Sequence, residues 1–265
     1  MLAVFRYIYI VTKERLYRLR QSLNPKIWSK RNQLLENTVA YRKEIIGQLE
    51  KGGYENIKNY SLSTWKYYGK DHVRLTFQAE RNRIKYIIKV TRGFEDKINN
   101  SIKFQQMFNE RFIFIPKGFQ VAFDGYVGYA TEYIKSFPFY CVRYLYTRSN
   151  IDGLLTQVNS ILDQLNEYKI VHCDLESVNV LISTIERKLY IIDWDTCCSD
   201  PINLHCEHFP AYTIKRRVDN GKYLYDDAYS FFTLFERLNI DGLAEKQGFM
   251  ELKNKIGRNT HVANE

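Results

Sequence analysis

Alternation of apolar and polar residues predicts a strand-rich region in the first half of the chain. The runs with this pattern are 63–69, 72–80, 83–91, 118–125 and 126–134. Turns are expected between neighbouring runs at the polar pair Arg81-Asn82 and at Asp124-Gly125, a strong hairpin signal. Two shorter runs, 179–183 and 189–193, are expected to form a further hairpin.

Helical spacing of apolar residues marks three other regions. Residues 1–52 are rich in Arg, Lys, Leu and Tyr and are predicted to be helical up to the pair Gly52-Gly53. A second helix is expected over 94–108, with apolar positions at Phe94, Ile98, Ile102 and Phe108. A third, over 151–168, has one broad apolar face formed by Leu154, Leu155, Val158, Ile161, Leu162 and Leu165. The chain thus runs from strands with one helix, through a connector near 133–150, into a helical part.

The composition is that of a globular protein, and the net charge suggests an anionic partner. Of its 265 residues 45% are hydrophobic and 26% charged, and the formal net charge is +9. Such a charge favours a nucleotide, a nucleic acid, an acidic glycan or an anionic membrane surface as partner. No nucleic-acid-binding motif is found, so nucleic acid is not expected among the partners.

Cysteine usage and the N-terminal segment bear on localisation. The cysteines are Cys141, Cys173, Cys197, Cys198 and Cys206. An odd number with one adjacent pair is not a secreted disulfide framework, so reduced thiols in a cytoplasmic protein are expected. Arg6 interrupts the first apolar run, no signal-peptide cleavage site follows, and no run is long enough to span a membrane. The basic, aromatic N-terminus either packs as an ordinary helix or lies on the inner membrane face, which would make the protein peripheral there.

Four polar residues surround the predicted hairpin at 179–193. His172, Asp174 and Asn179 occupy a short polar loop before its first strand, and Asp193 ends the second strand. Asn179 and Asp193 offer hard oxygen ligands of the kind that Mg²⁺ prefers. Asp174 is then left to accept a proton from an attacking hydroxyl, or to orient it.

This constellation resembles the protein-kinase-like superfamily. The pattern His-x-Asp-x-x-x-x-Asn, followed by a strand that ends in Asp, is matched by His172, Asp174, Asn179 and Asp193. The resemblance implies that Asp174 is the catalytic base, that Asn179 and Asp193 hold Mg²⁺, and that His172 braces the loop. It also implies an α+β, two-lobed fold with ATP bound between the lobes. The expected organisation is a basic helical segment (1–54), a small β-rich N-lobe (55–134) and a larger helical C-lobe (135–265).

Other parts of the chain extend the resemblance. Lys89 ends an apolar strand as the phosphate-binding lysine of kinases does, and it is preferred to Lys85, which lies nearer the start of that strand. The stretch 129–134 is similar to the strand that enters the interlobe hinge, so the adenine edge is expected to meet the backbone of Glu132, Tyr133 and Ile134. The stretch 225–238 is similar to the kinase helix whose buried Asp, here Asp227, supports the catalytic loop. A helix N-cap at Asp226 or Asp227 is compatible with that role.

The departures from the family pattern concern the phosphates and the acceptor. No G-x-G-x-x-G occurs, so backbone amides and Lys70 or Arg74 are expected to cover the phosphates. The acidic partner of Lys89 is left open between Glu95, Glu110 and none, with Gln105 at a plausible inward position.

Further departures lie in the catalytic loop and after the metal Asp. Cys173 replaces the usual Arg, and Glu176 stands where Ser/Thr protein kinases place a Lys. Trp194-Asp195 replaces Phe-Gly. The chain therefore looks closer to aminoglycoside phosphotransferases, choline kinases and bacterial kinases of lipopolysaccharide core sugars.

The expected activity is ATP- and Mg²⁺-dependent transfer of a phosphoryl group to a hydroxyl of a sugar, a glycolipid or another small acceptor. The charge favours an acidic or phosphorylated glycan. A protein kinase and a non-catalytic pseudokinase remain the alternatives. A zinc site is a further alternative for the cluster Cys197, Cys198, His205, Cys206 and His208, although its spacing is not that of known zinc motifs.

Overall fold

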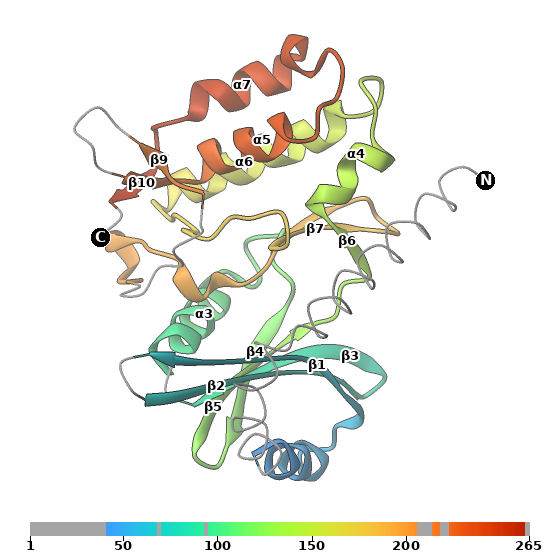
Figure 1. Ribbon diagram of the computed structural model, residues 1–265, viewed down its shortest axis with the longest axis vertical. Coiled ribbons are helices and arrows are strands. Elements are labelled where there is room, and N and C mark those ends of the chain that lie inside the picture. The colour runs from blue at the N-terminus through green and yellow to red at the C-terminus, as the bar shows by residue number, and fades with distance from the viewer. Residues whose placement is uncertain (1–40, 68–69, 93–94, 206–213, 218–222, 263–265) are drawn as a thin grey trace, which may run out of the picture.

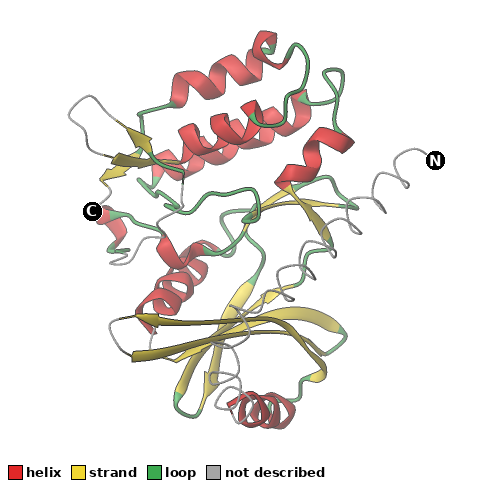
Figure 2. Ribbon diagram, viewed as in Figure 1, coloured by secondary structure: helices red, strands yellow, loops and turns green. Residues whose placement is uncertain are grey.

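The computed structural model describes residues 41–67, 70–92, 95–205, 214–217 and 223–262. It shows an α+β protein with a five-stranded antiparallel sheet on one side and a group of helices on the other (Figure 1, Figure 2). The first 40 residues, most of the predicted N-terminal helical segment, lie outside the described residues. Among those described, no helix combines the length and the apolar character needed to span a bilayer.

The large sheet has the strand order β1-β2-β3-β5-β4. Its strands are β1 (Glu55–Tyr67), β2 (Lys70–Arg81), β3 (Ile84–Arg92), β4 (Gly118–Phe123) and β5 (Tyr126–Glu132). All neighbouring pairs are antiparallel, and α3 (Glu95–Phe108) connects β3 to β4. The predicted strands and the helix at 94–108 are thus confirmed in type. β1 starts well before the predicted position 63. Two register shifts against β2 interrupt the regular alternation at its beginning, so the sequence pattern did not reveal this part of the strand.

The two hairpin turns differ in how well they were predicted. Asp124-Gly125 is confirmed, since Phe123 pairs directly with Tyr126. The other turn is Asn82-Arg83, one residue later than predicted, and both residues have positive φ (52° and 64°). Positive φ at both central positions is type I′ geometry, whose twist matches that of the strands.

The helix over residues 41–51 covers one face of the large sheet and ends where predicted, at Gly52-Gly53 (Figure 1). Its buried Ile45 and Leu49 join a hydrophobic cluster with sheet residues that include Leu75, Phe77, Ile88 and Val90. Gly53 has a φ of 78°, the left-handed conformation in which glycine commonly ends a helix.

The helical part has its own, larger hydrophobic core. Its helices are α4 (Val142–Leu145), α5 (Asp152–Glu167), α6 (Asp227–Glu236) and α7 (Gln247–Lys255), with 3₁₀ turns η1 (Phe139–Cys141), η2 (Trp194–Thr196), η3 (Asp200–Ile202) and η4 (Leu243–Glu245). The apolar face predicted for 151–168 is buried along α5. The helix predicted at 225–238 begins two residues later, because Tyr225 and Asp226 pair with the last strand.

Two small sheets complete the helical part. One is formed by β6 (Ser136–Pro138), β7 (Val180–Ser183) and β8 (Leu189–Ile191), and the other by β9 (Arg216–Arg217), β10 (Tyr223–Asp226) and β11 (Thr260–Val262). The predicted hairpin at 179–193 is confirmed by the antiparallel pairing of β7 with β8. The predicted connector near 133–150 contains structure that the pattern did not reveal, namely β6, η1 and α4.

Candidate active site

His172 braces the loop that joins α5 to β7 from inside the protein. Its side chain is fully buried, and its Nε2 donates to the carbonyl oxygen of Ile192 at 3.0 Å. Its Nδ1 accepts from the backbone N–H of Asp174 at 3.3 Å. Burial lowers the pKa of His172 to about 4, so the ring is neutral at pH 7. A neutral imidazole has one donor and one acceptor, and both are used, the donor by Ile192 after β8 and the acceptor by Asp174 in the loop.

Asp226 and Asp227 divide the two roles that the sequence left open. Asp226 caps α6, where its side chain accepts from the backbone N–H of Tyr229 at 3.0 Å. Asp227 is buried and accepts from the backbone N–H of His172 at 2.8 Å. Burial raises the pKa of Asp227 to about 7, while the hydrogen bonds from the backbone of His172 and Cys173 act in the opposite direction. Asp227 therefore attaches the polar loop to α6.

Asn179 fixes the position of Asp174. Its Nδ2 donates to the backbone carbonyl oxygen of Asp174 at 2.8 Å and to Asp174 Oδ2 at 3.2 Å. Asn179 is buried, whereas Asp174 is half-buried. With its amide nitrogen engaged in this way, Asn179 has its Oδ1 left as an acceptor or a metal ligand.

Asp193 and Lys89 meet although 104 residues separate them in the chain. Lys89 Nζ lies 2.5 Å from Asp193 Oδ1, and the two side chains are 14% and 24% exposed. Lys89 projects from β3 and also lies over the ring of Tyr129, 5.6 Å from its centroid. Lys85, on the same strand, is exposed. Asp193 is joined to Asn179 through its neighbour Ile192, whose N–H donates to the Asn179 carbonyl oxygen at 2.9 Å.

Two residues around the site hold left-handed backbone conformations. Cys173 has a φ of 62° and Asp193 a φ of 67°. Such conformations cost about 1–3 kcal/mol at a residue other than glycine and persist where the surrounding structure holds them. Here one of them sets the course of the backbone just before Asp174, and the other sets it at Asp193 itself.

The residues after Asp193 attach the site to α3. Trp194 is buried and stacks on Phe104 with ring centroids 3.9 Å apart, and it meets the His172 ring edge-on at 4.5 Å. Asp195 is also buried and accepts from Ser101 Oγ at 2.5 Å and from Tyr129 at 3.4 Å. The segment after Asp193 is therefore joined to α3 through Trp194 and Asp195, and to β5 through Asp195.

Sequence reasoning did not identify the α3 side of this network. Ser101 binds Asp195, and Asn100 Nδ2 donates to the carbonyl oxygen of Cys197 at 2.7 Å. Ser101 lies three residues after Ile98 and directly before Ile102, so helical spacing places it on the same inward face. A small polar residue within an apolar stripe is the signal that could have found it.

The acidic partner of Lys89 was left open in the sequence. Among the described side chains Lys89 pairs with the carboxylate of Asp193, and Glu110 is exposed. The side chain of Glu95 lies outside the described residues, as do those of Lys70 and Arg74.

The inward position expected for Gln105 is observed, since this residue is 3% exposed. It lies near Gly118, where an added Cβ would come within 2.9 Å of Gln105 Oε1.

The backbone of Glu132, Tyr133 and Ile134 lies where β5 leaves the large sheet. The N–H groups of Glu132 and Tyr133 donate to the carbonyl oxygens of Lys117 and Lys85, both at 2.8 Å. In the part of the chain that the structure describes, no acceptor is recorded for the Ile134 N–H. This donor could bind the edge of a base.

The oxygen donors of the site fit a magnesium ion. Asp193 supplies a carboxylate and Asn179 an amide oxygen that accepts no hydrogen bond among the described residues. Mg²⁺ takes few protein ligands and completes its octahedron with water and phosphate oxygens. Two ligands are therefore sufficient for Mg²⁺ in the presence of a nucleotide.

The cysteine and histidine cluster gives no support for zinc within the described residues. Cys197 and Cys198 are buried and form no disulfide, and no group of three or more His, Cys, Asp or Glu in the described ranges could hold a metal. His205 lies 3.6 Å from the carboxylate of Asp200. Cys206 and His208 lie outside the described residues.

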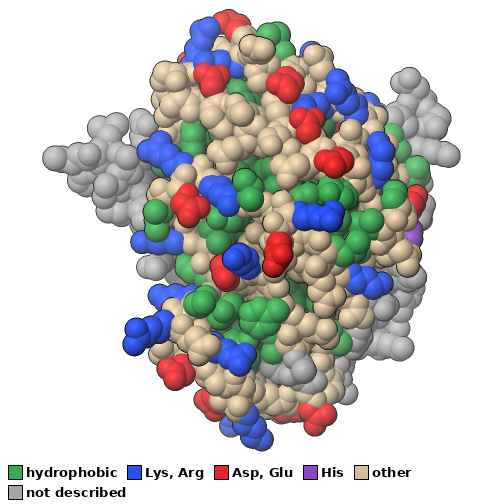
Figure 3. All heavy atoms as spheres, turned by 180° about the vertical axis from the view of Figure 1, so that it is seen from behind, with side chains coloured by type: hydrophobic (Ala, Val, Ile, Leu, Met, Phe, Trp, Pro, Cys, Tyr) green, Lys and Arg blue, Asp and Glu red, His purple; other side chains and the backbone are tan. Residues whose placement is uncertain are grey.

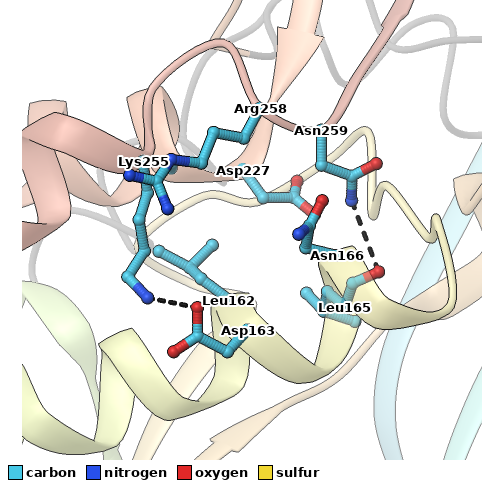
Figure 4. A pocket seen from close by; sticks show the side chains of 9 residues that line it. Leu162, Asp163, Leu165, Asn166, Asp227, Lys255, Arg258 and Asn259 are labelled. Carbon is cyan, nitrogen blue, oxygen red and sulfur yellow. Dashed lines mark hydrogen bonds and ion pairs between the residues drawn. The ribbon is translucent and has the colours of Figure 1, made fainter.

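A small pocket lies behind the polar loop, between α5 and the residues after α7 (Figure 4). Asp227 borders it, and Lys255 and Asp163 form an ion pair at its edge (Figure 4). Its volume of about 20 Å³ has room for one water molecule. Asn259 Nδ2 donates to the carbonyl oxygen of Ile170 at 2.5 Å, which holds the chain just before the loop. The residues around this pocket thus hold the loop in place, and the pocket itself is too small for a ligand.

No protein-family model matches this chain, and no curated protein matches it. The functional assignment therefore rests on the residues of the site and their geometry.

Proposed function

We propose that this protein is an ATP- and Mg²⁺-dependent phosphotransferase that phosphorylates a hydroxyl of a sugar or glycolipid. The observation that carries the proposal is the contact of Lys89 with Asp193 across 104 residues, next to the hydrogen-bonded pair Asp174 and Asn179. A cation, two metal-type oxygen ligands and a carboxylate beside them are the side chains that phosphoryl transfer requires. In this proposal, 55–134 and 135–265 are the two lobes of a kinase-like fold.

Each residue has a defined role in the proposed reaction. Asp174 orients the acceptor hydroxyl and accepts its proton while the hydroxyl oxygen attacks the γ-phosphorus of ATP and ADP leaves. Lys89 neutralises charge on the α- and β-phosphates. Asn179 and Asp193 would hold Mg²⁺, which supplies neutralisation of phosphate charge. The backbone of Glu132, Tyr133 and Ile134 would bind the adenine edge, with the Ile134 N–H as the donor, because none of the described residues accepts from it.

Most of the rate enhancement in this account comes from positioning and charge neutralisation. The structure holds these groups through contacts that do not involve a substrate. His172 and Asp227 fix the loop before Asp174, and Ser101 and Phe104 fix the segment after Asp193. Such preorganisation means that little reorganisation of the protein accompanies the reaction.

The proposal is tested by incubating the full chain with MgATP and a fractionated pool of envelope glycans and soluble metabolites. Mass spectrometry should find at least one component that gains one phosphoryl group only when protein and ATP are both present. A generic protein mixture serves as the competing acceptor. Efficient phosphorylation of that mixture would replace the sugar assignment with a protein kinase, and absence of transfer together with absence of MgATP binding would refute both.

A further inference from the structure

A polar pocket lies beside the loop that carries Asp174, on the side of α6. Its volume is about 300 Å³, the lower end of the range found for small-molecule sites. It is lined by Glu176, Ser177, Ile214, Lys215, Tyr229, Thr233, Leu234 and Arg237. The proposed roles of ATP and Mg²⁺ use none of these residues.

The wall of this pocket is continuous with the catalytic loop. The N–H of Glu176 donates to the carbonyl oxygen of Asp174 at 3.0 Å, and the Glu176 carbonyl oxygen accepts from the N–H of Asn179 at 3.0 Å. Ser177 is fixed in turn, because its carbonyl oxygen accepts from the N–H of Phe139 at 2.9 Å. A molecule bound in the pocket would therefore lie next to Asp174 in a defined position.

Three charged side chains line the pocket without neutralising one another. Among the described residues, Glu176, Lys215 and Arg237 make no ion pair within 4 Å. Lys215 lies over the ring of Tyr225, 5.4 Å from its centroid, so its cation is held near the pocket. Partial burial raises the pKa of Glu176, and the charge of Arg237 acts in the opposite direction.

The hydroxyl groups of the pocket define the kind of ligand further. Ser177, Tyr229 and Thr233 each contribute a hydroxyl for which the described residues provide no hydrogen-bond partner. Hydroxyls and one carboxylate bind a polyhydroxylated molecule, whereas two cations bind an anionic substituent. Two cations also disfavour a basic peptide, which would need acidic side chains here.

We propose that this pocket is the acceptor subsite and that it binds a hexose bearing a phosphate or carboxylate group. Glu176 accepts hydrogen bonds from the sugar hydroxyls, and Lys215 and Arg237 pair with the anionic group. The assignment of this pocket to the acceptor rests on the proposed function, because only a protein that transfers a phosphoryl group has an acceptor for that group. Binding of the sugar itself requires neither ATP nor transfer, so it can be measured separately.

The experiment is calorimetric titration of the full chain, without ATP, with glucose, mannose and galactose. Each sugar is used as the neutral hexose, the 6-phosphate and the uronate, which separates phosphate from carboxylate as the anionic group. At least one anionic hexose should bind about tenfold or more tightly than its neutral parent. The double variant Lys215→Met/Arg237→Met should remove that difference, and Glu176→Gln should weaken the neutral and anionic forms alike.

The matched control is Lys103→Met/Lys253→Met, which removes the same charge at two exposed helix positions that form no ion pair with another described residue. It should bind like the unmodified chain. Equal binding of anionic and neutral hexoses, an unchanged preference in the double pocket variant, or tighter binding of an arginine-rich peptide than of any hexose would overturn the proposal. Sugar binding without transfer to any acceptor would leave the subsite standing and refute the proposed function alone.

Discussion

Lys85 and Lys89 lie on the same strand and on the same face, yet only Lys89 reaches Asp193. Side chains four residues apart in a strand point in one direction, so alternation cannot choose between them. Lys89 lies at the part of the sheet that faces α3, because it pairs with Tyr129, which packs with Ile98 and Ile102 of that helix and contacts Asp195. From the sequence, Lys89 was preferred because of the resemblance to kinases. The physical difference between the two lysines lies in tertiary contacts, which only the structure shows.

Substituting Lys89 tests its role against a control on the same strand. Lys89→Met should weaken MgATP binding about tenfold or more, since the ammonium that neutralises the phosphates is lost. Lys85→Met removes an equal charge at an exposed position and should leave the affinity unchanged. Calorimetric titration of both variants with MgATP measures this. Equal affinities in the two variants would show that Lys89 does not bind the nucleotide.

At the scale of elements, local patterns predicted more than contacts between distant segments. The strands of the large sheet, the long helix α5 and the hairpin of β7 with β8 followed from periodicity. His172, Asp174 and Asn179 were found because they share one short loop, where spacing in sequence is close to spacing in space. The link from Asp195 to Ser101 joins residues 94 positions apart, and no local pattern reports such a pair.

The Ser101 contact predicts how strongly α3 holds the segment after Asp193. Ser101→Ala removes a hydrogen-bond donor from the buried Asp195 carboxylate and should lower the free energy of unfolding by about 1–3 kcal/mol. Asn99→Ala, at an exposed position of the same helix, should change it by less than about 0.5 kcal/mol. Urea unfolding of both variants checks this. Equal stabilities would mean that the Ser101 bond contributes nothing.

The junction of the loop with α6 predicts a dependence of stability on pH. The pKa of His172 is about 4 in the fold, below its ordinary 6.5, so its contribution is complete above pH 6.5 and is lost as pH falls toward 4. The pKa of Asp227 is about 7, above its ordinary 3.8, so its contribution is complete below pH 3.8 and is lost as pH rises toward 7. The two slopes oppose each other between about pH 4 and 6.5.

Asp227→Asn should remove one of these slopes and expose the other. Between pH 4.5 and 6.5 the free energy of unfolding of the variant should rise by about 2 kcal/mol relative to that of the unmodified chain. Chemical denaturation of both proteins at several pH values measures the difference. Parallel pH profiles would contradict the opposed titration of His172 and Asp227.

For the whole molecule, the sequence predicted an α+β fold and has a net charge of +9. The total charge alone does not say which part of the chain binds an anionic partner. Residues 1–40 contain eight Lys or Arg and two Glu, so they carry six of the nine net positive charges. On the face seen in Figure 3, basic and acidic side chains are interspersed. The charge of the whole chain therefore reflects the N-terminal segment more than the pocket lined by Lys215 and Arg237, and we interpret that segment as one that binds an anionic membrane surface.

Vesicle binding tests that interpretation. The full chain should bind phosphatidylserine vesicles more tightly than phosphatidylcholine vesicles, and added salt should weaken the binding. Changing Lys13, Arg15, Arg18 and Arg20 to Gln should reduce it at least tenfold, since each basic residue near the surface contributes about 1 kcal/mol. Changing the exposed Lys51, Lys103, Lys117 and Lys253 to Gln is the matched control. Equal losses in both variants would show that the N-terminal charges have no special role.

The most direct test of the central claim is the activity of Asp174→Asn. This change keeps the shape of the side chain and removes the proposed base, so MgATP should still bind while transfer to the acceptor pool falls by about 10²–10⁴-fold. Asp241→Asn, at an exposed position far along the chain, should transfer at the unmodified rate. Mass spectrometry of the acceptor pool after incubation with MgATP and each protein gives the answer. Loss of phosphorylation in Asp174→Asn alone is the predicted result, and undiminished phosphorylation by that variant would contradict the account.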